Sequence, residues 1–266
     1  PTSTVAPTHS EMKFTTYRLD SAVEFDKKYA SRSRLDVVSK TFSRIAQEVL
    51  LKQERTSASL ILGTLQGNAA TNLLSVNNAT GNKVTLDDFN KLLTLAKRLN
   101  PSWAGGTPEN RGRGISDLIV SPEIVESLRA MAYNPIASGS NTDIPATDSM
   151  RDSIYQNAGV PEFFGLGIME AYEMGRGQRF NKIYEGLVND AAVFADASQE
   201  IVIGLDRSKD ALMRAVALDS DTGAQMTLVA DDQYSVRQQR IGYYGALEEG
   251  RMILNDKAIV GMSVTM

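Results

Sequence analysis

The sequence contains no cysteine among its 266 residues. Disulfides, thiolate metal sites and cysteine nucleophiles are therefore excluded together, and packing alone has to hold the fold. Histidine is nearly absent as well, since His9 is the only one and lies in a polar N-terminal stretch. A histidine-dependent catalytic triad or metal site would have to use this one residue. The sequence therefore argues against both as the function of the chain.

Long apolar runs and an excess of basic charge are also missing. No run approaches the roughly 20 apolar residues that cross a bilayer, and residues 1–10 lack the regions of a signal peptide. We therefore expect synthesis in a cytoplasm and no membrane partner. The net charge is -4 and the pI is about 5.2. This balance argues against a broad nucleic-acid-binding surface, which needs clustered lysine and arginine.

The chain begins with a polar segment. Residues 1–12 are rich in proline, threonine and serine, which predicts an extended arm that buries little surface. Pro1 in place of a methionine is compatible with methionine removal, with proteolytic maturation and with a fragment. Residues 12–19 alternate between two faces and predict a strand. Apolar residues make up 42% of the chain, enough for one large or two modest domains.

A long helix is the clearest local prediction. From residue 34 the apolar positions, among them Phe42, Ile45 and Val49, recur at steps of three and four, and no glycine or proline intervenes before Gly63. The pattern predicts a helix over 34–66, roughly 45 Å long. This exceeds the usual globular helix and indicates a spine, whose charged residues form a solvated face.

The middle of the chain alternates loops with short elements. Residues 63–84 are expected to form a loop, because they are rich in glycine and asparagine. A capping-box variant at Thr85 to Asp88 begins a helix over 85–99, and Ser121 with Pro122 begins a helix over 122–132 after a strand at 115–120. Residues 134–160 carry little pattern, and a connection of that length favours a contact-making segment.

The C-terminal part is expected to be rich in strands. Residues 170–192 are expected to be irregular, and three glycines between 234 and 254 favour long bent strands over a helix. The other predicted strands cover residues 163–169, 200–206, 211–217, 225–230 and 257–265.

Several short motifs suggest chemistry, and each has a simpler structural explanation. Gly165-Leu-Gly167 lacks the third glycine of a dinucleotide fingerprint and favours a close strand crossing. Asp219 to Gly223 resembles a calcium loop without its terminal glutamate and favours a turn. The pairs Asp231-Asp232 and Glu248-Glu249 point to opposite faces of a strand, so they favour ion pairs, including pairs between subunits, over a catalytic dyad.

Other motifs leave two interpretations open. Gly175-Arg-Gly177 and the turn ending at Gly114 favour flexible loops, and either could present an arginine at a subunit boundary. Tyr243-Tyr244 and Trp103 could anchor an interface or pack in a core. We therefore predict no catalytic, cofactor-binding or metal-binding residue, no cofactor, and a protein that is not an enzyme.

The order of these elements resembles the major capsid protein of tailed bacteriophages, the Hong Kong 97 type fold. The resemblance covers nearly the whole chain. Its most specific pieces are Ile-Val-Ser-Pro-Glu at 119–123, Phe-Phe-Gly-Leu-Gly at 163–167 and Ala-Ile-Val-Gly-Met-Ser-Val at 258–264. It implies an α+β fold with a long spine helix, an axial domain, and a peripheral domain with long antiparallel strands.

The resemblance also implies a domain division. Residues 1–33 would be an N-terminal arm and the remnant of an extended loop, which is shortened here or partly lost. Residues 34–84 and 207–254 would form the peripheral domain, including the spine helix, and residues 85–206 and 255–266 the axial domain.

By the same resemblance, the chain is a major capsid (head) protein. It would assemble with itself into hexamers and pentamers of an icosahedral virion shell around double-stranded DNA, without sequence-specific binding. It would be made in the host cytoplasm, and portal, scaffold and decoration proteins are possible further partners. An encapsulin-like compartment around protein cargo is the alternative, although the N-terminal helical region of that relative is missing. An unrelated enzyme or binding domain would need a convergent polar site, which the sequence does not show.

The resemblance raises one chemical question, the covalent lysine–asparagine linkage of the type member. That reaction needs a lysine on the extended loop, an asparagine in the peripheral domain and a glutamate as base. No asparagine lies between Asn189 and Asn255, so the segment from Asp231 to Arg251 cannot supply the acceptor. We therefore expect a shell without covalent links, held by arms, by ion pairs of Arg237 or Arg240, or by a decoration protein.

Overall fold

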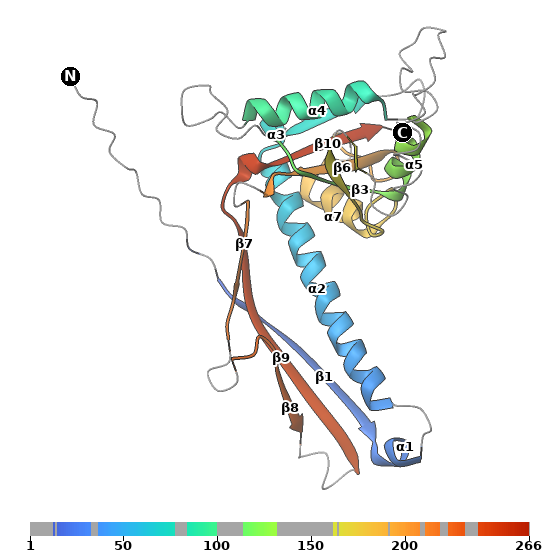
Figure 1. Ribbon diagram of the computed structural model, residues 1–266, viewed down its shortest axis with the longest axis vertical. Coiled ribbons are helices and arrows are strands. Elements are labelled where there is room, and N and C mark those ends of the chain that lie inside the picture. Colours follow the sequence, from blue (N-terminus) through green and yellow to red (C-terminus); the bar gives the residue numbers. More distant parts are fainter. Residues whose placement is uncertain are drawn as a thin grey trace, which may run out of the picture. The chain divides into compact units, whose positions relative to one another are not determined.

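The computed structural model describes residues 13, 15–32, 37–77, 84–99, 114–131, 162–163, 165–190, 192–207, 211–218, 223–231 and 239–265. These residues form an α+β fold, as expected (Figure 1). The helices are α1 (Lys27–Arg32), α2 (Val37–Gly67), α3 (Ala69–Asn72), α4 (Leu86–Leu99), α5 (Pro122–Met131), α7 (Arg179–Val188) and the 3-10 helix η2 (Asp256–Ala258). The strands are β1 (Tyr17–Asp26), β2 (Leu73–Asn77), β3 (Asp117–Val120), β4 (Glu162–Phe163), β5 (Leu166–Glu170), β6 (Gln199–Leu205), β7 (Leu212–Val216), β8 (Thr227–Asp231), β9 (Arg240–Ile253) and β10 (Ile259–Thr265).

The chain divides into two compact units. Unit 1 comprises Pro1–Gln53 and Met213–Met252, and unit 2 comprises Glu54–Leu212 and Ile253–Met266. Unit 2 thus contains the whole of the expected axial block, 85–206 and 255–266. Residues 54–84, 207–212 and 253–254 also group with unit 2, and the described residues before 34 group with the long strands of unit 1.

Unit 1 is built around the long strand β9. Strand β1 pairs with it antiparallel from Tyr17 opposite Glu249 to Asp26 opposite Arg240. Strand β8 also pairs with β9 antiparallel, from Thr227 opposite Ala246, and β7 is the other neighbour of β9 in the four-stranded sheet. The long antiparallel strands expected near the C-terminus are therefore confirmed, and β1 is their partner.

One face of this sheet is covered by the first half of α2. Side chains alternate along β1, so that every second residue from Tyr17 to Val23 is half-buried, whereas Arg18, Asp20 and Ala22 are exposed. The ring of Tyr243 stacks at 6.3 Å from that of Phe25 and meets Phe42 edge-on at 4.8 Å. On the same helix Ile45 is only 1% exposed. The apolar stripe of the predicted spine helix therefore faces a core, and Tyr243 packs in it.

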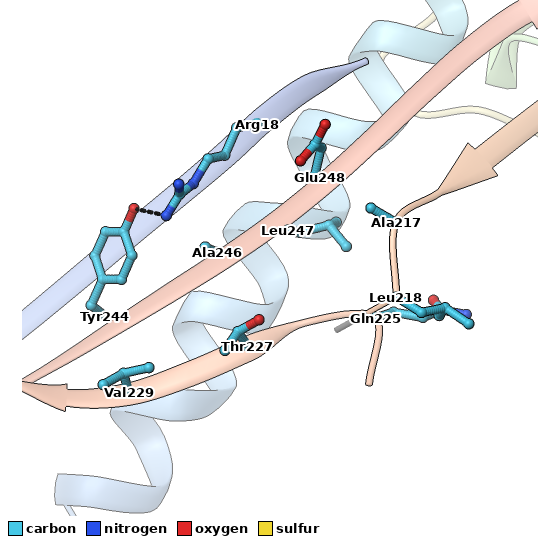
Figure 2. Close-up of a pocket in the computed structure, with 10 residues that line it drawn as sticks. All are labelled: Arg18, Ala217, Leu218, Gln225, Thr227, Val229, Tyr244, Ala246, Leu247 and Glu248. Carbon is cyan, nitrogen blue, oxygen red and sulfur yellow. Dashed lines mark hydrogen bonds between the residues drawn. The ribbon is translucent and has the colours of Figure 1, made fainter. Parts of the chain in front are cut away.

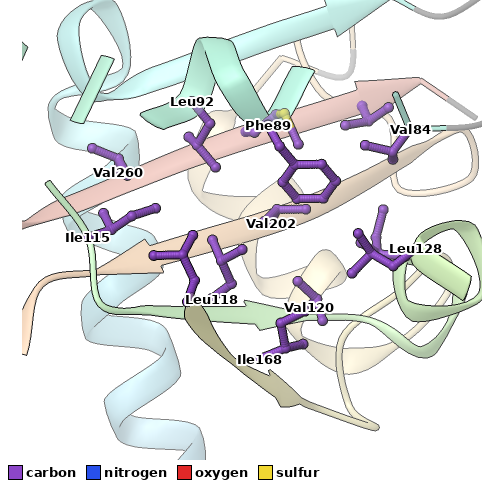
Figure 3. Packing of buried hydrophobic residues seen from close by; sticks show 14 of the residues in the cluster. Val84, Phe89, Leu92, Ile115, Leu118, Val120, Leu128, Ile168, Val202 and Val260 are labelled. Carbon is purple, nitrogen blue, oxygen red and sulfur yellow. The ribbon is translucent and has the colours of Figure 1, made fainter. Parts of the chain in front are cut away.

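Unit 2 is a six-stranded mixed sheet between helices. The strand order is β2-β10-β6-β3-β5-β4, in which β10 with β2 and β3 with β5 are parallel and the other pairs are antiparallel. One apolar cluster joins the sheet to α4 and α5, with Phe89 and Leu92 close to fully buried (Figure 3). A second cluster joins the sheet to α7 and the end of α2.

Strand β6 contributes side chains to the apolar clusters on both faces of the sheet. Val202 belongs to the α4 and α5 cluster, whereas Ile201 and Ile203 belong to the α2 and α7 cluster. Successive side chains of a strand point to opposite faces, so a continuous apolar run is what a sheet covered on both sides requires. Gly261 has a specific packing role, because a Cβ there would lie 3.0 Å from Leu73 and 3.1 Å from Leu65.

Both predicted helix starts in unit 2 are confirmed. The Asp88 carboxylate accepts hydrogen bonds from the backbone N–H of Thr85 at 2.9 Å and from its hydroxyl at 2.7 Å. The Ser121 hydroxyl accepts from the backbone N–H of Ile124 at 3.4 Å. These contacts satisfy backbone donors that the first helical turn leaves without an intrahelical partner.

Three expectations about local structure are corrected. The segment 63–84 is not one loop, because α2 continues to Gly67 and is followed by α3 and β2. The segment 170–192 is not irregular throughout, because it contains α7. The strand expected at 12–19 begins at Tyr17 and extends to Asp26. Within the described residues, no helix is both long and apolar enough to cross a membrane.

Candidate functional site

The structure separates the carboxylates that the sequence sets side by side. Glu248 is exposed on the sheet of unit 1, whereas Glu249 is fully buried. This confirms that the two do not form a dyad. The ion pairs of Glu249 lie within its own unit, which corrects the idea that it pairs between subunits. His9, Trp103, Asp232, Arg237 and the segment 134–160 lie outside the described residues.

Glu249 is the centre of a buried charge cluster in unit 1. Its carboxylate accepts hydrogen bonds from the Tyr17 hydroxyl at 2.8 Å, from Gln53 Nε2 at 3.1 Å and from Arg214 Nε at 2.8 Å. Arg251 Nη2 lies 3.2 Å from the same carboxylate, and Arg251 also donates to the backbone carbonyl of Gln53. One side chain thus connects β1, α2, β7 and β9.

The charge of Glu249 is stabilised by these partners. Burial by itself would raise the pKa of its carboxyl group. The hydrogen bond from Tyr17 and the contacts with Arg214 and Arg251 outweigh burial, so the pKa is held below its usual range. Glu249 is therefore a structural anion, because a general acid would need a raised pKa.

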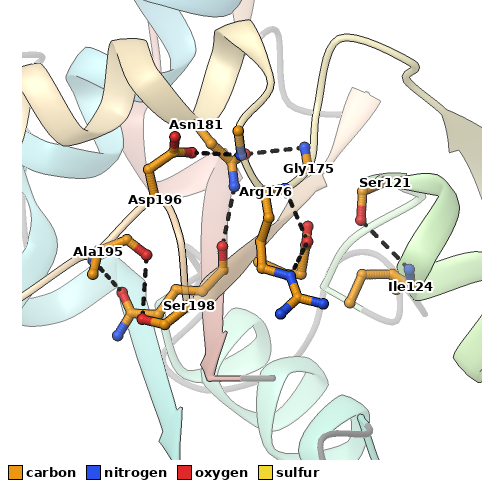
Figure 4. Close-up of polar contacts among 11 residues, drawn as sticks. Ser121, Ile124, Gly175, Arg176, Asn181, Ala195, Asp196 and Ser198 are labelled. Carbon is orange, nitrogen blue, oxygen red and sulfur yellow. Dashed lines mark hydrogen bonds and ion pairs between the residues drawn. The ribbon is translucent and has the colours of Figure 1, made fainter.

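A second polar cluster lies in unit 2, around the turn that begins at Gly175 (Figure 4). Three successive backbone N–H groups donate to side chains of three different segments. Gly175 donates to Asn181 at 3.1 Å, Arg176 to Glu200 at 3.0 Å and Gly177 to Asp196 at 3.2 Å. Gly175 and Gly177 have φ angles of 131° and 72°, which other residues rarely adopt. The motif that the sequence assigned to a flexible loop is therefore extensively anchored.

Glu200 is also fully buried, but its charge is poorly compensated. Among the described residues it forms an ion pair with Arg176, whose Nε lies 3.5 Å away and whose side chain is 42% exposed. Oxygen Oε2 of Glu200 and oxygen Oε2 of Glu123 are both buried without a hydrogen-bond partner. Burial raises the pKa of Glu200, and the charge of Glu123 adds to it, whereas hydrogen bonds from Ser121 and the Arg176 amide oppose the shift.

The segment leading to this turn is fixed to α2. Arg55 donates from Nε to Glu173 at 3.0 Å and from Nη2 to the other carboxylate oxygen at 2.7 Å. This forked pair is half-buried, and the hydrogen bond from Arg55 holds the pKa of Glu173 below its usual range. Tyr172, next to Glu173, is 78% exposed.

Unit 1 carries an open groove of about 320 Å³ on the outer face of its sheet (Figure 2). Arg18 lies at one side, where its guanidinium donates to the Tyr244 hydroxyl at 2.9 Å. Thr227 and Val229 of β8 contribute lining residues beside Ala246. Tyr244 is thus on the outer face, opposite to Tyr243. The groove combines the opposite charges of Arg18 and Glu248 with two hydroxyl groups, an amide and several short or apolar side chains.

Within the described ranges, no group of three or more histidine, cysteine, aspartate or glutamate side chains could hold a metal ion. The polar clusters of both units consist of ion pairs and backbone contacts. Large apolar side chains are nevertheless exposed in each unit. They are Leu50, Leu51, Met213, Leu218, Leu228 and Val229 in unit 1, and Met169, Tyr172, Leu187, Val193, Leu212 and Leu254 in unit 2. These exposed apolar side chains on the described surface can make contacts with other molecules.

No protein-family model and no curated protein matches the sequence. The fold does match solved structures. The capsid of cyanophage Pam1 matches with a TM-score of 0.58 and 11% identity, over 95% of this chain and 75% of the other. The capsid of cyanophage P-SCSP1u matches with a TM-score of 0.55 and 13% identity, over 100% and 80%. The capsid of a native GTA particle computed with C5 symmetry matches with a TM-score of 0.55 and 10% identity, over 95% and 74%.

These matches establish the architecture. The chain has the fold of the Hong Kong 97 type phage capsid proteins, with the long helix, the sheet covered on both faces and the long antiparallel strands that the element order predicts. At identities of 10 to 13% the likeness concerns the fold alone.

Proposed function

We propose that this protein is the major capsid subunit of a tailed bacteriophage. Copies of the chain assemble into hexamers and pentamers of an icosahedral shell that encloses double-stranded DNA, without catalytic turnover. The observation that carries the proposal is the fold shared with phage capsids over 95% or more of this chain. Exposed apolar side chains in both units support it, because a subunit in a ring needs two different contact surfaces.

In this proposal the two compact units have separate roles. Unit 2, with its double-covered sheet, is the axial domain around the symmetry axis of a capsomer. Unit 1, with β1 and β9, is the peripheral part, and β1 belongs to the extended loop that precedes the spine helix. The net charge of -4 is more compatible with a shell that encloses DNA than with a protein that binds DNA tightly, because tight phosphate binding requires a basic surface.

Electron microscopy of the purified protein tests the proposal. Closed shells with fivefold and sixfold capsomers are expected, and a stable monomer under all assembly conditions would contradict it. The content of particles from the natural source distinguishes a phage head from a protein compartment. Nuclease-protected double-stranded DNA supports a phage head, whereas an enclosed protein cargo would support a compartment.

The way in which subunits are held together has its own test. The segment Asp231 to Arg251 contains no asparagine, and Arg240 already pairs within unit 1 with Glu24 at 2.8 Å and Asp26 at 3.1 Å. We expect non-covalent contacts only. Mature particles boiled in detergent should run as single chains of 29.0 kDa. A ladder of covalent multimers would show that an acceptor lies elsewhere.

A further inference from the structure

Two buried carboxylate oxygens in unit 2 lie against the same turn. Oε2 of Glu123 is 2.9 Å from the position that a Cβ of Gly175 would occupy, and Oε1 of Glu200 accepts the Arg176 N–H at 3.0 Å. The second oxygen of Glu200, like that of Glu123, is buried and has no hydrogen-bond partner. Buried acceptors of this kind are costly, and each native example calls for an explanation.

The charges around Glu200 do not balance. The groups that face it are the Arg176 guanidinium at 3.5 Å, the Ser121 hydroxyl and the Glu123 carboxylate. The turn itself is also held by Asn181 of α7 and by the Asp196 carboxylate. With both glutamates ionised, one half-exposed arginine faces two carboxylates, and Asp196 adds a third nearby. One further positive charge would make the pair and its arginine neutral.

We propose that Glu123 and Glu200 form a proton-operated latch for the turn Gly175 to Gln178. A proton taken from solvent binds Oε2 of Glu200, so Glu200 and Glu123 together carry one negative charge in place of two. Arg176 then neutralises the pair, and the turn stays closed on α5 and β6. When the proton returns to solvent, the second buried negative charge favours opening of the turn.

The direction of the pH effect follows from the pKa of Glu200. Burial, with the charge of Glu123, raises that pKa above its ordinary value of 4.5, so the closed turn binds the proton more tightly than the open one. The stabilisation is complete below the ordinary value and is lost as the pH rises through the raised pKa. Tyr172 lies three residues before Gly175, so opening of the turn also changes the position of the exposed Tyr172 ring.

Hydrogen–deuterium exchange of the intact protein tests the latch. Exchange of the backbone amides 175–178 is followed from pH 4.5 to 8 and corrected for the intrinsic rate. We expect the opening constant to rise about tenfold per pH unit between the ordinary and the raised pKa, because one proton leaves on opening, and then to level off. Glu200→Gln should make the profile flat. Glu126→Gln, at an exposed position of the same helix α5, should leave the wild-type profile unchanged.

Two results would overturn the latch. A flat profile in the wild type would mean that water, or no group at all, satisfies the oxygens. Protection that falls with a chelator and returns with Mg²⁺ or Ca²⁺ would assign the pair to a cation. Should Glu200→Gln fail to fold, Glu123→Gln replaces it and should move the transition to lower pH. Infrared spectra of the wild type add an independent measurement, since a protonated carboxyl band must disappear over the same pH range.

Discussion

Among the described residues, each unit buries one glutamate completely, and the pKa values of the two glutamates are shifted in opposite directions. In unit 1, Glu249 has two arginines, a tyrosine and a glutamine around it. In unit 2, Glu200 has one half-exposed arginine at 3.5 Å and an oxygen without a partner. The pKa of Glu249 is lowered and that of Glu200 is raised, although burial pushes both upward. The number and distance of the donors decide between the two outcomes.

This difference between the surroundings of Glu249 and Glu200 indicates which part of the fold opens more easily. A buried carboxylate whose charge is met by several donors joins the strands and the helix around it into a single cooperative element. A partly satisfied network lies at the low-stability end of a fold, where local opening occurs first. We therefore expect unit 1 to be fixed around Glu249, and the turn beside Glu200 to be the part that responds to conditions.

The largest effect is expected from a buried carboxylate with no partner at all. Ile45 is 1% exposed in the core of unit 1, and Ile45→Asp would place an uncompensated charge there. The cost of several kcal/mol is a large share of a typical domain stability of about 5–15 kcal/mol, so we expect loss of folding, not of assembly alone. Circular dichroism and urea unfolding measure it.

The matched control for this substitution is Leu50→Asp on the same helix, where the side chain is 62% exposed. It should leave the fold intact. Cooperative unfolding of Ile45→Asp at wild-type urea concentrations would show that the apolar stripe of α2 does not contribute to the core.

The next largest effect is expected at Glu249. Glu249→Ala leaves Arg214 and Arg251 without their shared anion, and breaking a buried pair from one side costs about 3–5 kcal/mol. Urea unfolding at neutral pH should show a lower midpoint. Glu248→Ala, at the exposed neighbouring position, is the control and should change the free energy of unfolding much less. Equal losses in the two variants would contradict the assigned geometry.

The sequence predicts well the features that rest on local periodicity. The long helix appears at 37–67 against a prediction of 34–66, and α4 and α5 begin at their predicted caps. The sequence also contains a helical pattern, that of α7, which the prediction missed. Phe180, Ile183, Tyr184, Leu187 and Val188 of α7 follow helical spacing, but mixed charge and nearby glycines obscured it. Strand β2 has only five residues and is stabilised by parallel pairing with β10, which no local pattern reveals.

The charge clusters could not be predicted, because their members are distant in sequence. The partners of Glu249 lie 35, 196 and 232 positions away. Alternation along a strand correctly placed Glu248 and Glu249 on opposite faces, but only the tertiary fold determines which cations meet the buried one. The same holds for Glu200, whose contacts come from α5 and from the turn at Gly175.

The two buried glutamates should give opposite responses to pH. The folded-state pKa of Glu249 is below its unfolded value, so its stabilisation is present above about pH 4.5 and is lost as the pH falls through the lowered pKa. Glu249→Gln should therefore reduce the acid-side slope of the unfolding free energy by up to about 1.4 kcal/mol per pH unit. An unchanged slope between pH 5 and about 2 would show that other carboxylates govern acid unfolding.

The last comparison concerns backbone strain at two glycines of the Glu200 turn, which Arg176 separates. Gly175→Ala should cost about 3 kcal/mol, because φ of 131° suits glycine almost exclusively, and its Cβ would also displace the Glu123 carboxylate 2.9 Å away. Gly177→Ala should cost about 1 kcal/mol, since φ of 72° is left-handed and no atom lies within 4 Å of its Cβ. Urea unfolding of both variants measures the difference. If the Gly177 variant is the less stable one, a Cβ at position 175 does not clash with the Glu123 carboxylate as the 2.9 Å distance indicates.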